Sequence, residues 1–234
     1  FIDILFNNSK LITARSEGMK KRILDIYPLA NNKVRLLNWG IKDEFFLSDF
    51  TNNKKENITI ISYRATGKIY NIDIIFDAIK KLKEEHGNIK FIYVEYNKSF
   101  DYNLDLSICD EIYSGLSSTE LATLLHKCDI SISLPSYDGF ATSLLETMAA
   151  GTLPVISDIE AYKYDFNEYD WLLVKSQINV DKLFEKINRI IIDVDLLYDK
   201  KKSRVEYIKK YYSREEQIKN LENIISFAYE KNKE

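Results

Sequence analysis

The sequence predicts an α/β protein whose Rossmann-like parallel sheet carries helices on both faces. Two observations lead to this prediction. Short apolar runs alternate along the chain with longer segments whose apolar residues recur at helical spacing. The apolar runs are nearly continuous, as expected for strands of a parallel sheet that is covered on both sides. The chain has 234 residues, which is enough for one large or two small domains.

The expected strands are short and rich in β-branched residues. They lie at 58–63, 89–96, 111–115, 129–135, 153–157 and 171–174. The expected helices follow them in alternation, and the one that begins after Ser117 carries Glu120 at the spacing of a capping box. These helices lie at 70–87, from 117 onward, at 141–150, and over 179–231 with a break near "YYSREE".

The first 46 residues are expected to be the tail end of a separate domain. "KLITAR", the helix "EGMKKRILDIY" and "VRLLNWGI" look like a βαβ unit, and two strands alone do not close a Rossmann-like domain. The polar segment "SDFTNNKKEN" at 48–57 then marks a boundary. We therefore expect three parts, at 1–46, 47–213 and 214–234.

Composition argues against several classes of protein. A net charge of −3 provides no basic field for nucleic acid, and no apolar run reaches the length of a membrane helix. The basic runs "DKKKSR" and "IKKYY" are interpreted as a solvated helix face, with contact to anionic lipid or a neighbouring domain as the alternative.

The cysteines and histidines do not indicate a metal site. Cys109 and Cys128 lack metal-binding spacing, which favours free thiols in a reducing compartment. His86 and His126 are interpreted as helix surface residues. No metal site is expected.

The segment "YDGFATSLLETMAAGTLPVISD" (137–158) holds the candidate site. On a helical wheel, one arc of helix 141–150 is polar and the opposite arc is apolar. The polar arc holds Thr142, Ser143, Glu146 and Thr147, with Ala150 among them, and the apolar arc holds Leu144, Leu145, Met148 and Ala149. The apolar arc is expected to lie on the sheet. Periodicity alone leaves Glu146 in solvent.

The position of this helix favours a ligand site. A strand ends, a glycine-containing loop follows, and a helix N-terminus begins, which is where parallel sheets bind ligands and where free N–H groups favour phosphate. Gly139 allows close approach of the backbone, and Glu146 could accept hydrogen bonds from two ribose hydroxyls. The small side chains that follow keep the pocket open, at Ala141, Thr142 and Ser143. The alternative for Asp138 is an ordinary turn or capping residue.

Taken together, these residues resemble the signature of the group 1 glycosyltransferases (family 4, GT-B fold). The family pattern places two acidic residues with seven positions between them in a stretch of the type E-G-F-G-x-x-x-x-E-A-M-A-x-G-x-P-V, and Asp138 and Glu146 have that spacing with Phe140 in place. "VRLLNWGI" and "ISYRATGKIYNIDIIFDAIKKL" resemble two further family segments. The resemblance covers about residues 10 to 230.

The resemblance implies a role for each matched residue. Asp138 would contact hydroxyls of the transferred sugar, Arg64 would neutralise the diphosphate, and Glu146 would bind the ribose. A second cation would come from Lys68, and for both cations the alternative is loop solubility. The remaining substrate-binding positions, whose backbone or small side chains would hold sugar and diphosphate, are Gly139, Phe140, Ala141, Thr142 and Ser143.

The resemblance also implies a function. The chain would carry the donor-binding half of a retaining glycosyltransferase that takes a nucleotide-sugar as donor substrate and needs neither metal nor cofactor. The acceptor would be a glycan, a lipid-linked molecule or a protein, and the location cytoplasmic, at or near the inner face of the membrane. The final helix would cross back to the N-terminal domain. The alternatives are a noncatalytic nucleotide- or sugar-binding module with this fold and a plain α/β scaffold in a larger assembly.

Overall fold

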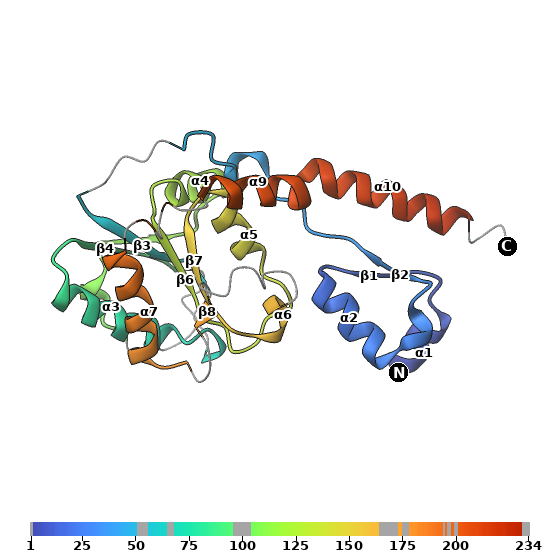
Figure 1. Ribbon diagram of the computed structural model, residues 1–234, viewed down its shortest axis with the longest axis horizontal. Helices are drawn as coiled ribbons and strands as arrows, with labels where there is room; N and C mark the ends of the chain where they lie inside the picture. Colours follow the sequence, from blue (N-terminus) through green and yellow to red (C-terminus); the bar gives the residue numbers. More distant parts are fainter. Residues whose placement is uncertain are drawn as a thin grey trace.

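A large sheet unit and a smaller N-terminal unit make up the protein (Figure 1). In this computed structural model the small unit lies beneath the long C-terminal helix, away from the large sheet (Figure 1). The structure describes residues 2–50, 56–64, 68–95, 104–163, 173–174, 178–193, 195, 198 and 201–230.

The large sheet has six parallel strands in the order β5-β4-β3-β6-β7-β8. Their bounds are β3 Ile58–Ser62, β4 Ile89–Glu95, β5 Glu111–Ser114, β6 Ile130–Ser133, β7 Leu153–Ser157 and β8 Leu173–Val174. The parallel α/β sheet is confirmed, and every predicted strand is present, although residues 96 and 171–172 of the predicted ranges lie outside the described residues. The order of the strands reverses between β3 and β6, as at the switch point of a Rossmann-like sheet.

One face of the sheet is covered by α3 (Ile72–Glu85) and α7 (Val180–Ile192) (Figure 1). Because side chains alternate along a strand, Ile58 and Ile60 face these helices while Ile61 faces the other side. Apolar side chains of α3 and α7 complete this core cluster.

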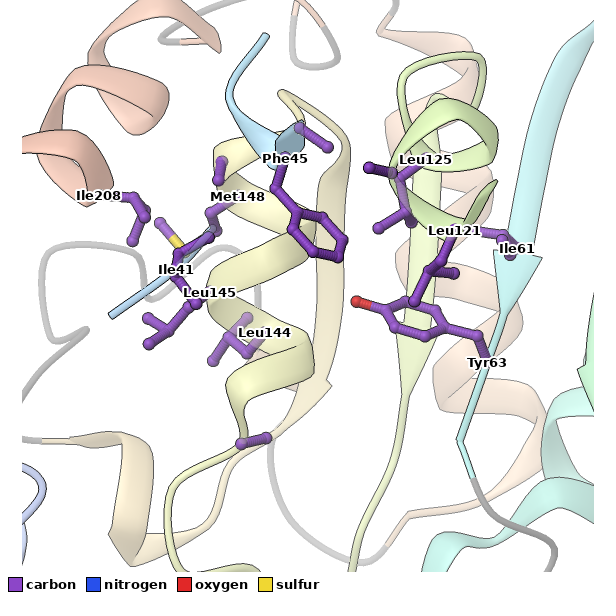
Figure 2. Close-up of a cluster of buried hydrophobic side chains, with 14 of the residues drawn as sticks. Ile41, Phe45, Ile61, Tyr63, Leu121, Leu125, Leu144, Leu145, Met148 and Ile208 are labelled. Carbon is purple, nitrogen blue, oxygen red and sulfur yellow. The ribbon is translucent and has the colours of Figure 1, made fainter. Parts of the chain in front are cut away.

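The opposite face is covered by α4 (Ser118–Leu125), α5 (Thr142–Ala149) and α9 (Lys201–Tyr212). The predicted capping box of α4 is present, since Ser117 accepts from the Glu120 N–H while the Glu120 carboxylate accepts from the Ser117 N–H. Figure 2 shows the apolar cluster between α4 and α5, in which Phe45 lies between the two helices. Phe45 belongs to the short helix η2 (Asp43–Phe45), which precedes the sheet in the sequence.

The small unit contains the βαβ arrangement that the sequence predicts. Strands β1 (Ile12–Ala14) and β2 (Val34–Leu36) pair in parallel, and α1 (Ile2–Asn8), α2 (Glu17–Ile26) and the turn η1 (Pro28–Ala30) complete the unit. Its buried core is small and consists of Ala14, Ala30 and Val34 with partly buried neighbours. The three domain ranges expected from the sequence stay predictions, and Ile41, just before the expected boundary, already packs in the core of the large unit.

The chain crosses between the two units twice, near Ile41 and near Ser213, and these two crossings contact each other. The Ile41 N–H donates to the Tyr212 carbonyl at 2.7 Å, and Ile41 forms a parallel bridge with Ser213, between α9 and α10 (Arg214–Glu230). A Cβ on Gly40 would lie 2.6 Å from the Gln217 Oε1 atom and 2.8 Å from a backbone atom of α10. Glycine is therefore required for this close approach.

Helix α10 runs along the small unit after this crossing (Figure 1). The guanidinium carbon of Arg35, in β2, lies 4.0 Å from the centre of the Phe227 ring. A groove of about 590 Å³ lies between β2, α2 and α10. Within the described residues, no helix is both long and apolar enough to cross a bilayer.

The two cysteines and the two histidines lie outside the predicted site. Cys109 and Cys128 are free thiols. His86 lies at the end of α3 with its Nε2 atom 2.7 Å from the Asn188 Oδ1 atom, and His126 lies at the end of α4 with its Nε2 atom 3.0 Å from a backbone carbonyl. Both histidines are half-buried, so they are less exposed than the surface positions predicted for them.

Candidate functional site

The candidate site lies where β3 and β6 end, at the switch point of the sheet. Arg64 follows β3, and the loop from Leu134 to Ala141 connects β6 to α5. Asn71, with a left-handed φ of 48°, joins the two connections, because its amide donates to the Leu134 carbonyl at 2.7 Å and to the Ser136 hydroxyl at 3.0 Å. Two connections that are far apart in the sequence are thus joined beside the ends of β3 and β6.

Arg64 is the centre of this site. One guanidinium nitrogen donates to the Asp138 Oδ2 atom at 2.6 Å and another donates to the Ser143 hydroxyl at 2.7 Å. Both members of the Arg64–Asp138 ion pair are 15% exposed, so the pair is largely withdrawn from water. The guanidinium also stacks 4.8 Å from the centre of the Tyr70 ring, in the short helix η3 (Lys68–Tyr70).

A second donor reaches the same carboxylate oxygen. The Tyr162 hydroxyl, in α6 (Glu160–Lys163), donates to the Asp138 Oδ2 atom at 3.0 Å. Tyr162 is 1% exposed, and burial together with the Asp138 charge raises the pKa of its phenol. The hydroxyl therefore stays protonated and acts as a hydrogen-bond donor. The sequence analysis did not identify Tyr162, because no motif connects it to Asp138.

Tyr63, which directly follows β3, contacts the first two turns of α5. The Tyr63 hydroxyl donates to the Ser143 carbonyl and lies 2.7 Å from the Thr147 hydroxyl, which in turn donates to the Ser131 hydroxyl at 3.4 Å. Figure 2 shows the oxygen of Tyr63 pointing toward α5. Thr147 is 2% exposed, so the prediction that it lies on a solvated arc is wrong.

Glu146 is partly buried one turn into α5, so it is less exposed than its alternative interpretation as a solvated helix residue predicts. Loss of solvent raises the pKa of its carboxyl above the ordinary value, and the positive charges of Lys42 and Arg64 oppose that rise. The cause is that α5 contacts α9 and η2 as well as the sheet. The helical wheel indicated a single buried face, whereas Thr142 is the one exposed residue of α5 and the others are buried or partly buried.

The other predicted site residues divide into three groups. Phe140 and Ala141 are buried, with the Phe140 ring stacked on Tyr212, so only their backbone can take part in binding. Gly139 faces open space, since a Cβ there would meet nothing within 4 Å. Lys68 is exposed in η3, and within the described part of the chain no contact joins it to the Arg64–Asp138 pair. The structure thus brings together Arg64, Asp138 and Ser143, but not Lys68.

A cavity of about 230 Å³ opens beside Asp138. The loop before α5, the segment α6 and the small unit's helix α2 all contribute to its wall. Its lining residues are Gly18, Met19, Arg22, Tyr137, Asp138, Gly139 and Ala161. Whole-ligand pockets typically have about 300–1,000 Å³, so this cavity is large enough for only part of a nucleotide-sugar.

The arrangement is suited to an anionic ligand with hydroxyl groups. A guanidinium and the N-terminus of an eight-residue helix provide positive potential, and Asp138 and Glu146 provide hydrogen-bond acceptors. No side chain caps the N-terminus of α5. Across the ranges that the structure describes, His, Cys, Asp and Glu form no group of three that could hold a metal ion.

About half of the chain is similar in sequence to a curated protein. The chain is 36% identical over 119 residues to the N,N'-diacetylbacillosaminyl-diphospho-undecaprenol alpha-1,3-N-acetylgalactosaminyltransferase of Campylobacter jejuni. The match includes 50% of this chain and 28% of that enzyme, so the chain spans well under two thirds of the relative it matches.

Solved structures share the fold at low sequence identity. A glycosyltransferase from Rickettsia africae has a TM-score of 0.74 and 18% identity, over 93% of this chain and 63% of that one. Sucrose-phosphate synthase from Thermosynechococcus elongatus has a TM-score of 0.75 and 14% identity, over 97% and 60%. Anabaena HepE, solved in complex with UDP-glucose, has a TM-score of 0.70 and 12% identity, over 96% and 65%.

The family assignment rests on a match that extends across most of the large unit. The family model described as "Glycosyl transferases group 1" matches residues 43–214, which include the whole sheet, α5 and the Arg64–Asp138 pair. The chain therefore belongs to the group 1 glycosyltransferases.

Proposed function

We propose that this chain binds the nucleotide-sugar donor of a glycosyltransferase that transfers a sugar with retention of configuration, as in family 4. The observation that supports this most directly is the clamp of Arg64 between Asp138 and Ser143 at the N-terminus of α5. The clamp stands at the switch point of a Rossmann-like sheet, where the two strand ends leave room for a ligand.

The chemistry that this site supports is departure of a nucleoside diphosphate. Breaking the sugar–phosphate bond leaves negative charge on the diphosphate, and the Arg64 guanidinium with the free N–H groups of α5 would stabilise it. Asp138 would accept hydrogen bonds from the transferred sugar, and Glu146 from the ribose hydroxyls. The acceptor would attack from the face that the leaving group vacates, since none of the described residues stands as an evident covalent nucleophile. No cofactor takes part.

The acceptor is proposed from the Campylobacter relative, whose name specifies a sugar linked through a diphosphate to undecaprenol. A glycan carried on a lipid is accordingly our choice among glycan, lipid and protein acceptors. Such an acceptor would bring the enzyme to the cytoplasmic face of the membrane as a peripheral protein. The donor sugar of that relative, N-acetylgalactosamine, is the first to test here.

Titration calorimetry of the 234-residue chain with UDP, GDP and ADP tests the donor site. We expect at least one of the three nucleotides to bind, and no heat with any of them at millimolar concentration would contradict the proposal. We also expect residues 1–234 alone to transfer no sugar, because the chain covers only 60–65% of the solved relatives described above. A noncatalytic module of this fold would bind in the same way, so restored transfer in a longer chain separates the two functions.

A further inference from the structure

Tyr162 is a buried side chain that reaches Asp138 from a third element. Arg64 follows β3, Asp138 precedes α5, and Tyr162 comes from α6, after β7. The phenol ring packs in the apolar cluster on the α5 side of the sheet, and its hydroxyl donates to the carboxylate at 3.0 Å. A ring that is 1% exposed is too deep to contact a ligand itself.

Both donors use the same oxygen of the carboxylate. Arg64 donates to the Asp138 Oδ2 atom at 2.6 Å and Tyr162 donates to it at 3.0 Å. Within the described residues, nothing donates to the other oxygen, Oδ1, although Asp138 lines the 230 Å³ cavity. Two donors from different directions fix the rotamer of a short side chain, and the remaining oxygen keeps its acceptor capacity.

We propose that Tyr162 is a positioning residue that, together with Arg64, holds Asp138 so that its second carboxylate oxygen accepts hydrogen bonds from the sugar of the donor. This inference rests on the proposed function of the site and adds a residue to it. Arg64 alone does not suffice for this task, because a guanidinium that also binds diphosphate is drawn toward the ligand. The Tyr162 hydroxyl has no such second role and keeps Asp138 in place when the donor is bound.

The proposal predicts that loss of the Tyr162 hydroxyl weakens binding of the sugar part of the donor and leaves binding of the nucleotide part nearly unchanged. Replacement of Tyr162 by Phe removes one hydroxyl and leaves the ring in the apolar cluster. We expect Tyr162→Phe to weaken binding of a nucleotide-sugar by about tenfold, the lower end for a hydrogen bond to a charged group, while binding of the nucleoside diphosphate changes less than about twofold. A residue that only supports the fold would change both affinities alike.

The experiment is titration calorimetry of the 234-residue chain with UDP, UDP-N-acetylgalactosamine and UDP-glucose, and with the GDP and ADP pairs if UDP does not bind. Tyr93→Phe is the matched control, because Tyr93 is also 1% exposed and its hydroxyl has no hydrogen-bond partner among the residues that the structure describes. That control should leave both affinities unchanged. Thermal unfolding confirms that each variant is folded.

A double-mutant cycle with Asp138→Asn shows whether Tyr162 acts through Asp138. On the Asn background, Tyr162→Phe should have little further effect on the part of the affinity that the sugar provides. Additive effects would overturn the proposal, as would equal losses for nucleotide and nucleotide-sugar, or no loss for either. Failure of Tyr162→Phe to fold, with Asp138→Asn folded, would assign the hydroxyl to stability and also overturn it. A wild-type chain that binds no nucleotide would instead contradict the proposed function.

Discussion

Helices α3 and α5 both cover the large sheet, but they present opposite surroundings to their polar residues. In α3, six residues are buried along one face, and the acidic and basic residues are exposed except for the partly buried Lys83. In α5, contacts with the sheet, α9 and η2 bury five of its eight residues, and Glu146 is left partly buried although it is an acidic residue. A helix that covers a sheet needs only one buried face. Partial burial of the Glu146 carboxylate lowers the stability of the fold, so the need for a stable fold does not explain it.

The largest expected effect is at the centre of the site. Replacement of Arg64 by Ala removes the cation of a pair that is 15% exposed on each side. We expect nucleoside diphosphate binding to weaken by about a hundredfold, or about 2.7 kcal/mol, and the free energy of unfolding to fall by about 2–3 kcal/mol because Asp138 loses its counter-charge. Calorimetry and urea unfolding measure the two effects.

Lys80→Ala on the exposed face of α3 is the matched control for this loss of a cation. It should change neither the affinity nor the free energy of unfolding by more than a few tenths of a kcal/mol. Wild-type affinity in Arg64→Ala would show that the diphosphate binds elsewhere.

A smaller effect, with opposite signs for binding and stability, is expected at Glu146. Glu146→Gln should weaken nucleoside diphosphate binding by about tenfold, because a charged acceptor becomes neutral. The same change should raise the melting temperature, because the buried charge is removed. Glu84→Gln, on the exposed face of α3, makes the identical substitution without burial and should alter neither quantity. If the two variants behave alike, the difference between α3 and α5 has no functional meaning.

The pH dependence of stability provides a finer test of the burial of Glu146. The pKa of its carboxyl is raised in the folded state, so the folded protein binds this proton more tightly than the unfolded chain does. That stabilisation is complete below the ordinary value of 4.5 and is lost as the pH rises through the raised folded value. The advantage of Glu146→Gln over the wild type in urea unfolding should therefore be near zero at the lowest pH and grow as the pH rises. A constant advantage would contradict the assignment.

The smallest effect concerns metal ions. Because Arg64 and the N-terminus of α5 can supply the positive charge for the diphosphate, EDTA should change nucleotide affinity by less than about twofold. Calorimetry in EDTA and in Mn²⁺ measures this directly. Binding that disappears in EDTA and returns with Mn²⁺ would contradict this prediction, because it would show that a metal ion, and not the Arg64 guanidinium, neutralises the diphosphate.

The sequence predicted the features that depend on neighbouring residues. The strands are continuous apolar runs, and the capping box of α4 joins Ser117 to Glu120, three residues on. Both could be recognised because the interacting groups lie within one turn or one strand. The placement of Arg64 beside Asp138 could also have been inferred, since both follow strands that are adjacent at the switch point.

The features that sequence reasoning missed are made by distant segments. The helical wheel assumed one buried face for α5, but Ile41, Phe45 and Ile208 come from other parts of the chain to cover it (Figure 2). Tyr162 meets Asp138 across 24 positions and two elements. Such contacts depend on how the elements pack, and no local spacing of residue types encodes them.

Gly40 has a mechanical consequence for the molecule. The chain passes between the units at two points that are joined through Ile41, Tyr212 and Ser213, and Gly40 touches α10 directly beside them. These contacts hold the two connections side by side where the chain passes between the units. Any side chain at position 40 would have to displace α10 or the connection before Ile41, and a shift of the small unit would carry α2 and its part of the cavity wall away from Asp138.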